Sequence, residues 1–272
     1  MNKLSINAFQ LKLIAIISML LNHTTVALWP IVPLWLHIPV GFIRGITFPI
    51  MAFFVVEGFR RTRNIKKYML RLAIFGAIAQ IPYTLVFGLF ILNIVFTILI
   101  GLCCLLLHEK LYVEKGKKAL FVVLFVLINI FFSFVVPVEG QFAGILLIFL
   151  FKVIKKSEMS RRTIPLIIIG VVNVIGGLAT YAMYQFAASV DEIGTLLIDE
   201  LGHGLLAGHT MMMSQYFVLP LGTFLIIPLL RAYNGELGKR AKFLFYTVYP
   251  GHFIILGLIA FALGLLVLPV LM

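Results

Sequence analysis

Long apolar segments follow one another along almost the whole chain, and they limit the folds open to it more than any motif does. Of the 272 residues, 62% are hydrophobic and 12% are charged, and the mean hydropathy is +1.12. Water-soluble domains do not have this composition. A bilayer core about 30 Å thick needs roughly 20 mostly apolar residues per helix. We therefore predict an all-α, polytopic transmembrane helix bundle, one domain over residues 1–272, in contact with the lipids of an inner or plasma membrane.

Nine segments are apolar enough to be predicted as spans. They are Phe9–Trp29, Val40–Phe59, Tyr68–Phe87, Leu89–Leu107 and residues 118–136, 140–155, 163–187, 214–230 and 243–269. Lysine and arginine accumulate in short loops on the cytoplasmic side, and here they cluster in alternate connections, after the second, fourth, sixth and eighth segments. This predicts an N-terminus inside and a C-terminus outside. The same sorting accounts for the net charge of +12 without a nucleic acid partner.

Two ionisable residues in the first segment have a spacing that puts them on one helix face. Lys12 and His23 are eleven positions apart in "LKLIAIISMLLNH", and eleven steps of about 100° make roughly three turns. Their axial separation is about 16 Å, which places Lys12 near the cytoplasmic surface and His23 near the middle of the membrane. Lys12 can equally extend its amine to the headgroups, and His23 can be a neutral imidazole bonded to a neighbouring helix.

Charged residues within other apolar segments are also candidates for function. A charge at the centre of a membrane helix costs about 2.5 to 3.5 kcal/mol even on insertion scales. Arg44 stays charged and needs an anionic partner or water. Counting from the basic connections places Arg44 and His252 at a depth similar to that of His23. Glu57 either joins these residues or pairs with the arginines that follow it.

Uncharged and acidic residues can line the same space. Asn93 and Thr97 are four positions apart and share a helix face, although hydrogen bonding between helices is the other explanation for this pair. Glu139 begins the sixth segment at the outer surface, where water can reach it, and Tyr249 lies in "FYTVYPGH".

These residues fit a cavity that opens to the cytoplasm, with basic residues at its mouth and histidine and arginine at its floor. Such a cavity suits a phosphate-rich cofactor that enters from inside, because its phosphates meet the mouth while its reactive end reaches an imidazole. Imidazole can act as a general base near neutral pH. The predicted phosphate ligands are Lys12, Arg60, Arg61, Arg63, Lys67 and Arg71.

Five stretches resemble the TraX family, which is named for a conjugative pilin acetyltransferase. They are "LKLIAIISMLLNH", "ITFPIMAFFVVEGFRRTRNIKKYMLRL", "AQIPY", "NIVFTILIGL" and "FYTVYPGH". The first stretch has a basic residue, a ten-residue spacer and a histidine, and is also similar to the signature of the acyltransferase-3 superfamily of membrane acyltransferases. The resemblance implies transfer of an acetyl group from cytosolic acetyl-CoA to a pilin amine or to a hydroxyl of a surface glycan.

The resemblance also implies roles for particular residues. His23 is the general base, Lys12 is the basic member of the signature, and Arg44 is the arginine before "FP". The full set of predicted catalytic residues is His23, Arg44, Glu57 and His252. The predicted substrate-binding residues are Asn93, Thr97, Glu139 and Tyr249. Direct transfer and a covalent acetyl-histidine relay both remain open.

The segment from Val190 to Met213 departs from the family pattern. It contains Asp199, His203 and His209, residue types that bind zinc, but their spacing matches no standard site. An amphipathic segment at the membrane interface is the alternative. We expect no metal, and we expect acceptor choice to depend on this segment.

Two other functions are compatible with buried ionisable residues. A transporter or proton-coupled carrier uses them as relays, although the chain shows no internal repeat of the kind that most carriers have. A non-catalytic scaffold for pilus or envelope assembly is the third possibility, but it requires no stripe of ionisable residues.

Overall fold

The computed structural model describes residues 5–88, 90–155, 157–190, 219–239 and 242–265. The regular structure of these residues is helical. The α-helices are α1 (Ala8–Ala27), α2 (Leu34–Arg61), α3 (Ile65–Phe87), α4 (Ile94–Leu107), α5 (Lys118–Ile130), α6 (Gln141–Val153), α7 (Glu158–Val190), α10 (Leu219–Gly222), α11 (Ile226–Arg231) and α12 (Lys242–Ala262). The π-helical turns η2 (His108–Glu114) and η3 (Phe131–Val135) extend α4 and α5, and η1 (Trp29–Ile31) and η5 (Thr223–Leu225) are 3-10 turns.

The predicted membrane helix bundle is confirmed in its general form. Six described helices are long and apolar enough to cross a membrane, namely Ala8–Ala27, Trp35–Arg61, Ile65–Phe87, Ile94–Glu114, Lys118–Val135 and Glu158–Ala179. Gln141–Val153 and Thr247–Ala262 are shorter apolar helices. Each of the nine predicted segments overlaps described helical structure. The count of nine spans and the sidedness of the termini stay predictions, and residues 214–218 and 266–269 lie outside the described part of the chain.

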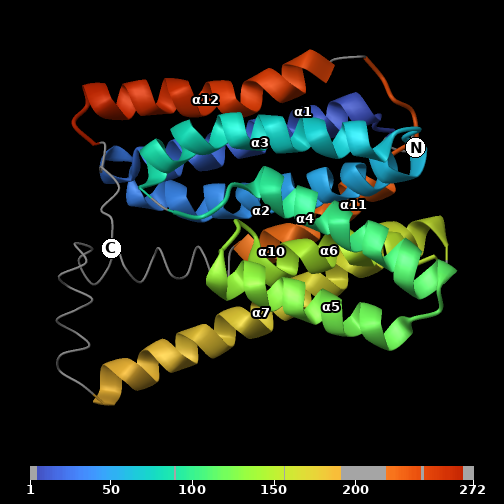
Figure 1. Cartoon of the computed structure of the whole chain (residues 1–272). Helices are drawn as coiled ribbons and strands as arrows, with labels where there is room; N and C mark the ends of the chain where they lie inside the picture. The colour runs from blue at the N-terminus through green and yellow to red at the C-terminus, as the bar shows by residue number, and fades with distance from the viewer. Residues whose placement is uncertain (1–4, 89, 156, 191–218, 240–241, 266–272) are drawn as a thin grey trace.

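Helix α2 lies at the centre of the bundle. It contacts α1, α4, α6 and α10, while α3 packs against α12 and α4, and α6 packs against α7 (Figure 1). The fully buried core consists of large apolar side chains of α2, α4 and α6, such as Phe53, Leu102 and Phe151. Apolar side chains also cover the outer faces, where Ile81 is 69% and Phe261 is 75% exposed. Such outer faces fit contact with lipid chains rather than with water.

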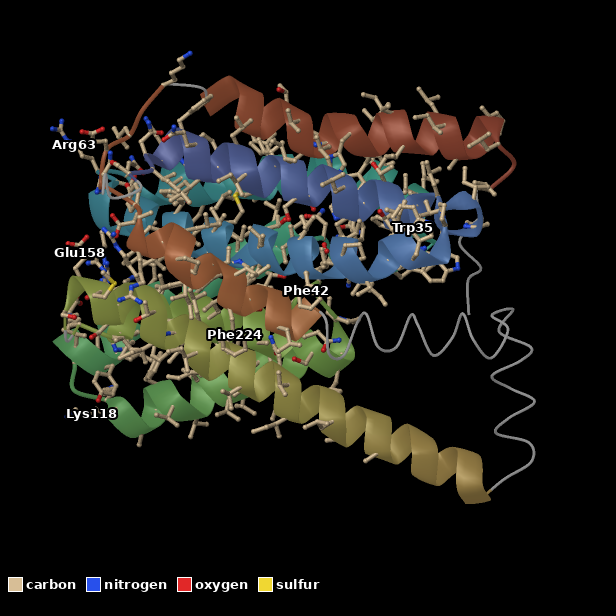
Figure 2. All side chains as sticks on the ribbon, turned by 180° about the vertical axis from the view of Figure 1, so that it is seen from behind. Trp35, Phe42, Arg63, Lys118, Glu158 and Phe224 are labelled. Atoms are coloured by element: carbon tan, nitrogen blue, oxygen red, sulfur yellow. The ribbon has the colours of Figure 1, made fainter. Side chains whose placement is uncertain are left out.

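Charged residues gather at one end of the bundle. Arg63, Lys118 and Glu158 lie at this end, and Trp35 lies at the other (Figure 2). We call the first the basic end. Ion pairs join helix ends there. For example, Lys152 of α6 contacts Glu109 of η2 at 2.6 Å. The basic connections that alternate along the sequence therefore meet in space.

The chain before α1 is held against the segment after α11. The backbone N–H of Ile6 donates to the carbonyl of Ala232 at 2.9 Å, and the N–H of Asn234 donates back to the carbonyl of Ile6 at 3.0 Å. Asn7 then forms a capping box with Gln10, which satisfies free N–H groups of the first turn. These contacts fix where α1 begins, and hence the height of His23 in the bundle.

A glycine permits the closest approach between α10 and α2. A Cβ atom added at Gly222 would lie 2.2 Å from the carbonyl oxygen of Phe42, a backbone atom that cannot rotate away. We expect Gly222→Ala to destabilise the protein by about 1 to 3 kcal/mol through overpacking, measured as a lower melting temperature in detergent. Gly176→Ala is the matched control, because a Cβ there meets no atom within 4 Å and alanine favours a helix. Equal melting temperatures of the two variants would contradict this packing.

Candidate functional site

Two histidines from opposite ends of the sequence meet inside the bundle. Nδ1 of His23, on α1, lies 2.7 Å from Nε2 of His252, on α12, and the two rings are stacked with an interplanar angle of 8°. Both side chains are buried, with relative exposures of 5% and 6%. The sequence placed these two residues at a similar depth, and in the structure they are in direct contact.

Aromatic side chains surround the two imidazoles. Phe253 and Phe87 lie 4.9 and 5.6 Å from the ring of His23, measured between centroids. Tyr83 packs edge-on against both of these phenyl rings, and Tyr249 lies 5.7 Å from the ring of His252. This shell keeps bulk water from the imidazoles, which strengthens electrostatic interactions between them and any polar group that enters.

His23 lies near the ends of two helices. It is four residues before the end of α1 at Ala27, and its neighbour Phe87 is the last residue of α3. The mid-membrane depth of His23 stays a prediction.

Arg44 lies within electrostatic range of His23 and of the carboxylate of Glu139. Among the described residues, no ion pair within 4.0 Å joins Arg44 to Glu139. Glu139 is thus a nearby opposite charge for Arg44 rather than a directly bonded partner.

Glu139 is part of a connected polar network rather than a group open to water. Its carboxylate accepts a hydrogen bond from the backbone N–H of Ile94 at 3.1 Å, where the positive end of the α4 dipole favours a negative charge. The hydroxyl of Thr97 donates to the backbone carbonyl of Glu139. Tyr83 and Tyr249 lie close to the same carboxylate. Glu139 therefore joins α4 to the start of α6, and this bonding reduces its availability to a substrate.

Asn93 has a structural role as well. Its side-chain amide donates to the carbonyl of Gly76 at 2.8 Å and to Gln80 at 2.9 Å, while its oxygen caps the N–H of Val95. The side chain is fully buried. Hydrogen bonding between helices, the alternative left open by the sequence, is the arrangement found for both Asn93 and Thr97.

Lys12 lies on α1 between the start of this helix and His23. Its ammonium group sits over the ring of Phe54 at 4.8 Å from the centroid, a cation–π contact. Between Lys12 and His23, the hydroxyl of Thr47 donates to Ser18 at 2.8 Å, across the interface of α1 and α2. Lys12 and Ser18 therefore contact α2, whereas His23 contacts α3 and α12.

Glu57 is not brought together with His23. Its carboxylate contacts Arg60, Arg61 and Arg161 at 3.3, 3.1 and 3.5 Å. From position 44 to position 57, α2 rises about 20 Å at 1.5 Å per residue. The ion pair that the sequence left as an alternative is therefore the one that forms, and the catalytic role predicted for Glu57 has no geometric support.

Replacing Glu57 tests this placement. In Glu57→Gln the three arginines lose the carboxylate that they share, and we expect the free energy of unfolding to fall by about 1 to 3 kcal/mol. Thermal unfolding in detergent measures this change, with the exposed Glu114→Gln as control. A Glu57→Gln variant of unchanged stability would contradict this placement.

The predicted phosphate ligands differ in their distance from His23. Arg60 is engaged with Glu57 and with the carbonyl of Phe151 at 3.0 Å. Arg63, Lys67 and Arg71 are exposed at the start of α3, and from Lys67 to Phe87 that helix rises about 30 Å. Lys12 is only about 16 Å below His23. Of the predicted phosphate ligands compared along their helices, Lys12 is the one nearest to His23, and its role as a phosphate ligand stays a prediction.

Sequence reasoning missed several residues of the site. Phe87 and Phe253 were taken as ordinary apolar positions, and Tyr83 was not singled out although it lies in "AQIPY". Asn22, which precedes His23 in the sequence, has a buried side-chain oxygen that lacks a hydrogen-bond partner among the described residues. No described residues form a cluster able to hold a metal ion, and Asp199, His203 and His209 lie outside the described part of the chain.

The arrangement can accept, hold and return a proton. An imidazole held in a water-poor shell can act as a base toward an N–H or O–H group that enters, and the neighbouring guanidinium can stabilise a developing oxyanion. An imidazole can also be a nucleophile.

Comparison with known proteins places the chain in a family. Residues 8–260 match the family model described as TraX protein. The probable fimbrial assembly protein FimC, serogroup H1, of Dichelobacter nodosus is 46% identical over 78 residues, which are 29% of this chain and 32% of that protein. The matched region thus covers about a third of the length of that relative. No solved structure matches the chain. Because the family model spans most of its length, the chain belongs to the TraX family.

Proposed function

We propose that the protein is a membrane-bound acyltransferase that moves an acetyl group from acetyl-CoA to an amine or hydroxyl acceptor. The observation that carries the proposal is the buried pair of His23 and His252 beside Arg44. A base, a neighbouring imidazole and a cation in a water-poor site are what acyl transfer from a thioester uses. The likeness to the acyltransferase-3 signature supports the same chemistry.

The reaction proceeds by direct transfer in this proposal. The acceptor gives its proton to Nε2 of His23, and its nitrogen or oxygen bonds to the carbonyl carbon of the thioester. Arg44 stabilises the oxyanion. The carbon–sulfur bond then breaks, and the proton on His23 passes to the sulfur. The products are the acetylated acceptor and free coenzyme A.

The donor is bound from the basic end. Arg60, Arg61, Arg161 and Arg162 share two carboxylates, Glu57 and Glu158, so positive charge is in excess there. This excess attracts the phosphates of acetyl-CoA, and Lys12 contacts the phosphate nearest the acyl arm. The basic end then faces the cytoplasm, in accord with the positive-inside rule.

The acceptor is a component of a pilus or of the cell surface. The family is named for a pilin acetyltransferase, and the relative from Dichelobacter nodosus is named as a fimbrial assembly protein. We therefore propose that the acylation takes part in pilus assembly.

Transfer of label from acetyl-CoA tests this function. Membranes from cells with and without the protein are incubated with acetyl-CoA labelled in the acetyl group, and labelled products are identified by mass spectrometry. We expect label on an acceptor only where the protein is present, with one free thiol released per acetyl group. Absence of protein-dependent label would overturn the proposal. Solute uptake by proteoliposomes without acetyl-CoA would instead support a carrier.

A further inference from the structure

The hydrogen bonds of His252 determine which of its nitrogens carries a proton. Its Nδ1 lies 2.9 Å from the backbone carbonyl of Val248, one turn earlier in α12. A carbonyl oxygen only accepts hydrogen bonds. Nδ1 of His252 is therefore the donor, and in a neutral imidazole the other nitrogen, Nε2, is then bare.

The bare nitrogen of His252 faces His23. Nε2 of His252 and Nδ1 of His23 are 2.7 Å apart, which is hydrogen-bonding distance, so the proton between them belongs to Nδ1 of His23. A neutral His23 that carries its proton on Nδ1 has a bare Nε2. The chain of bonds from Val248 through His252 thus ends in an unprotonated nitrogen on His23.

The neutral state of both rings follows from their surroundings. If His252 carried two protons, its Nε2 would donate to His23 and the assignment would reverse. That imidazolium would be buried against the rings of Phe253 and Tyr249, 3.9 and 5.7 Å away between centroids. Burial among aromatic rings disfavours a second proton.

We propose that His252 is a positioning residue that fixes the tautomer of His23, so that Nε2 of His23 is the nitrogen that takes the proton of the acceptor. This inference rests on the proposed function in one respect, namely that the step served by Nε2 is removal of the proton from the acceptor. The assignment of the tautomer depends only on the two contacts of His252 with Val248 and His23. Without an acceptor for Nδ1–H, the imidazole of His23 is free to move its proton to Nε2, where it blocks the base.

Variants of His252 that differ only in hydrogen-bonding ability test the proposal. His252→Leu removes both contacts but fills a similar volume. His252→Gln offers an oxygen to Nδ1–H of His23 and an amide N–H to the carbonyl of Val248. His108→Leu is the control. His108 lies in η2, directly after the C-terminal end of α4, and stacks on Tyr112 instead of on His23 or His252. Size-exclusion profiles in detergent show whether each variant is folded.

Nitrogen NMR of histidine-labelled protein in liposomes reads the tautomer directly, with the signal of His23 identified by its loss in His23→Gln. In the wild type near neutral pH we expect a protonated Nδ1 and a bare Nε2. His252→Leu shifts the proton toward Nε2, whereas His252→Gln and His108→Leu keep the wild-type pattern. A wild-type spectrum with the proton on Nε2, or a pattern unchanged in His252→Leu, would overturn the inference.

Kinetics show whether the tautomer matters for transfer. We expect His252→Leu to lower kcat about 10- to 100-fold, as loss of a group that orients a functional imidazole does, with KM for acetyl-CoA unchanged. His252→Gln recovers most of this loss. Equal rates of folded His252→Leu and His252→Gln would contradict a positioning role. The wild-type protein could give the expected spectrum and yet transfer no acetyl group. That result would overturn the proposed function but leave the tautomer assignment in place.

Discussion

Replacing His23 by glutamine is expected to lower acetyl transfer by about 10²- to 10⁴-fold, the range attributed to a positioned general base. The glutamine amide can still donate to Nε2 of His252, the contact that His23 makes in the wild type. The buried pair of polar groups is therefore kept, and the loss is confined to proton transfer. The rate of label incorporation per folded molecule measures the effect.

The matched control for this variant is His108→Gln. His108 is a partly buried histidine that stacks on the ring of Tyr112, and it lies in η2, away from the pair of His23 and His252. We expect it to transfer acetyl groups at close to the wild-type rate. A His23→Gln protein that folds and retains more than a tenth of the wild-type rate would show that His23 is not the base.

Replacing Glu139 by alanine is expected to destabilise the protein by about 1 to 3 kcal/mol. That range is found when a buried hydrogen-bonding group loses its partner. Here the N–H of Ile94 would lose its acceptor, and Arg44 would lose the nearby negative charge. Thermal unfolding in detergent measures the loss.

A double variant tests the interaction of the two charges separately from the hydrogen bond that Glu139 accepts from Ile94. Arg44→Met combined with Glu139→Met removes both charges, and we expect it to be more stable than Glu139→Ala alone, since neighbouring partners are not additive. It should transfer no acetyl groups, because Arg44 is absent. Glu236→Ala, on an exposed segment, serves as control. Full additivity of the two single changes would contradict the pairing.

The membrane helices were predictable from sequence because a bilayer imposes a minimum length of apolar residues, and this requirement is visible without knowledge of contacts. Helix ends were predicted less well. The second predicted segment began at Val40, whereas α2 begins at Leu34, since Pro39 lies within the helix instead of before it. The clusters of lysine and arginine were correctly expected to meet, because membrane insertion sorts charges between the two sides.

The site was predictable only where a residue was costly to bury. His23, Arg44 and His252 were selected because ionisable side chains rarely persist in apolar helices without a reason, and the structure brings these three together. Glu57 satisfied the same criterion but is paired at the basic end. Helical periodicity gives the face of one helix, and it does not give the neighbour that this face meets. The aromatic shell was missed because phenylalanine is common in every membrane helix.

The contact between His23 and His252 joins positions that are 229 residues apart. During synthesis α1 is made first, and it remains without its partner until α12, the last described helix, has been inserted beside it. Every intermediate length of chain therefore contains one imidazole but not the pair. An incompletely synthesised protein thus lacks the pair, and in the proposed function acyl transfer begins only after α12 has been placed.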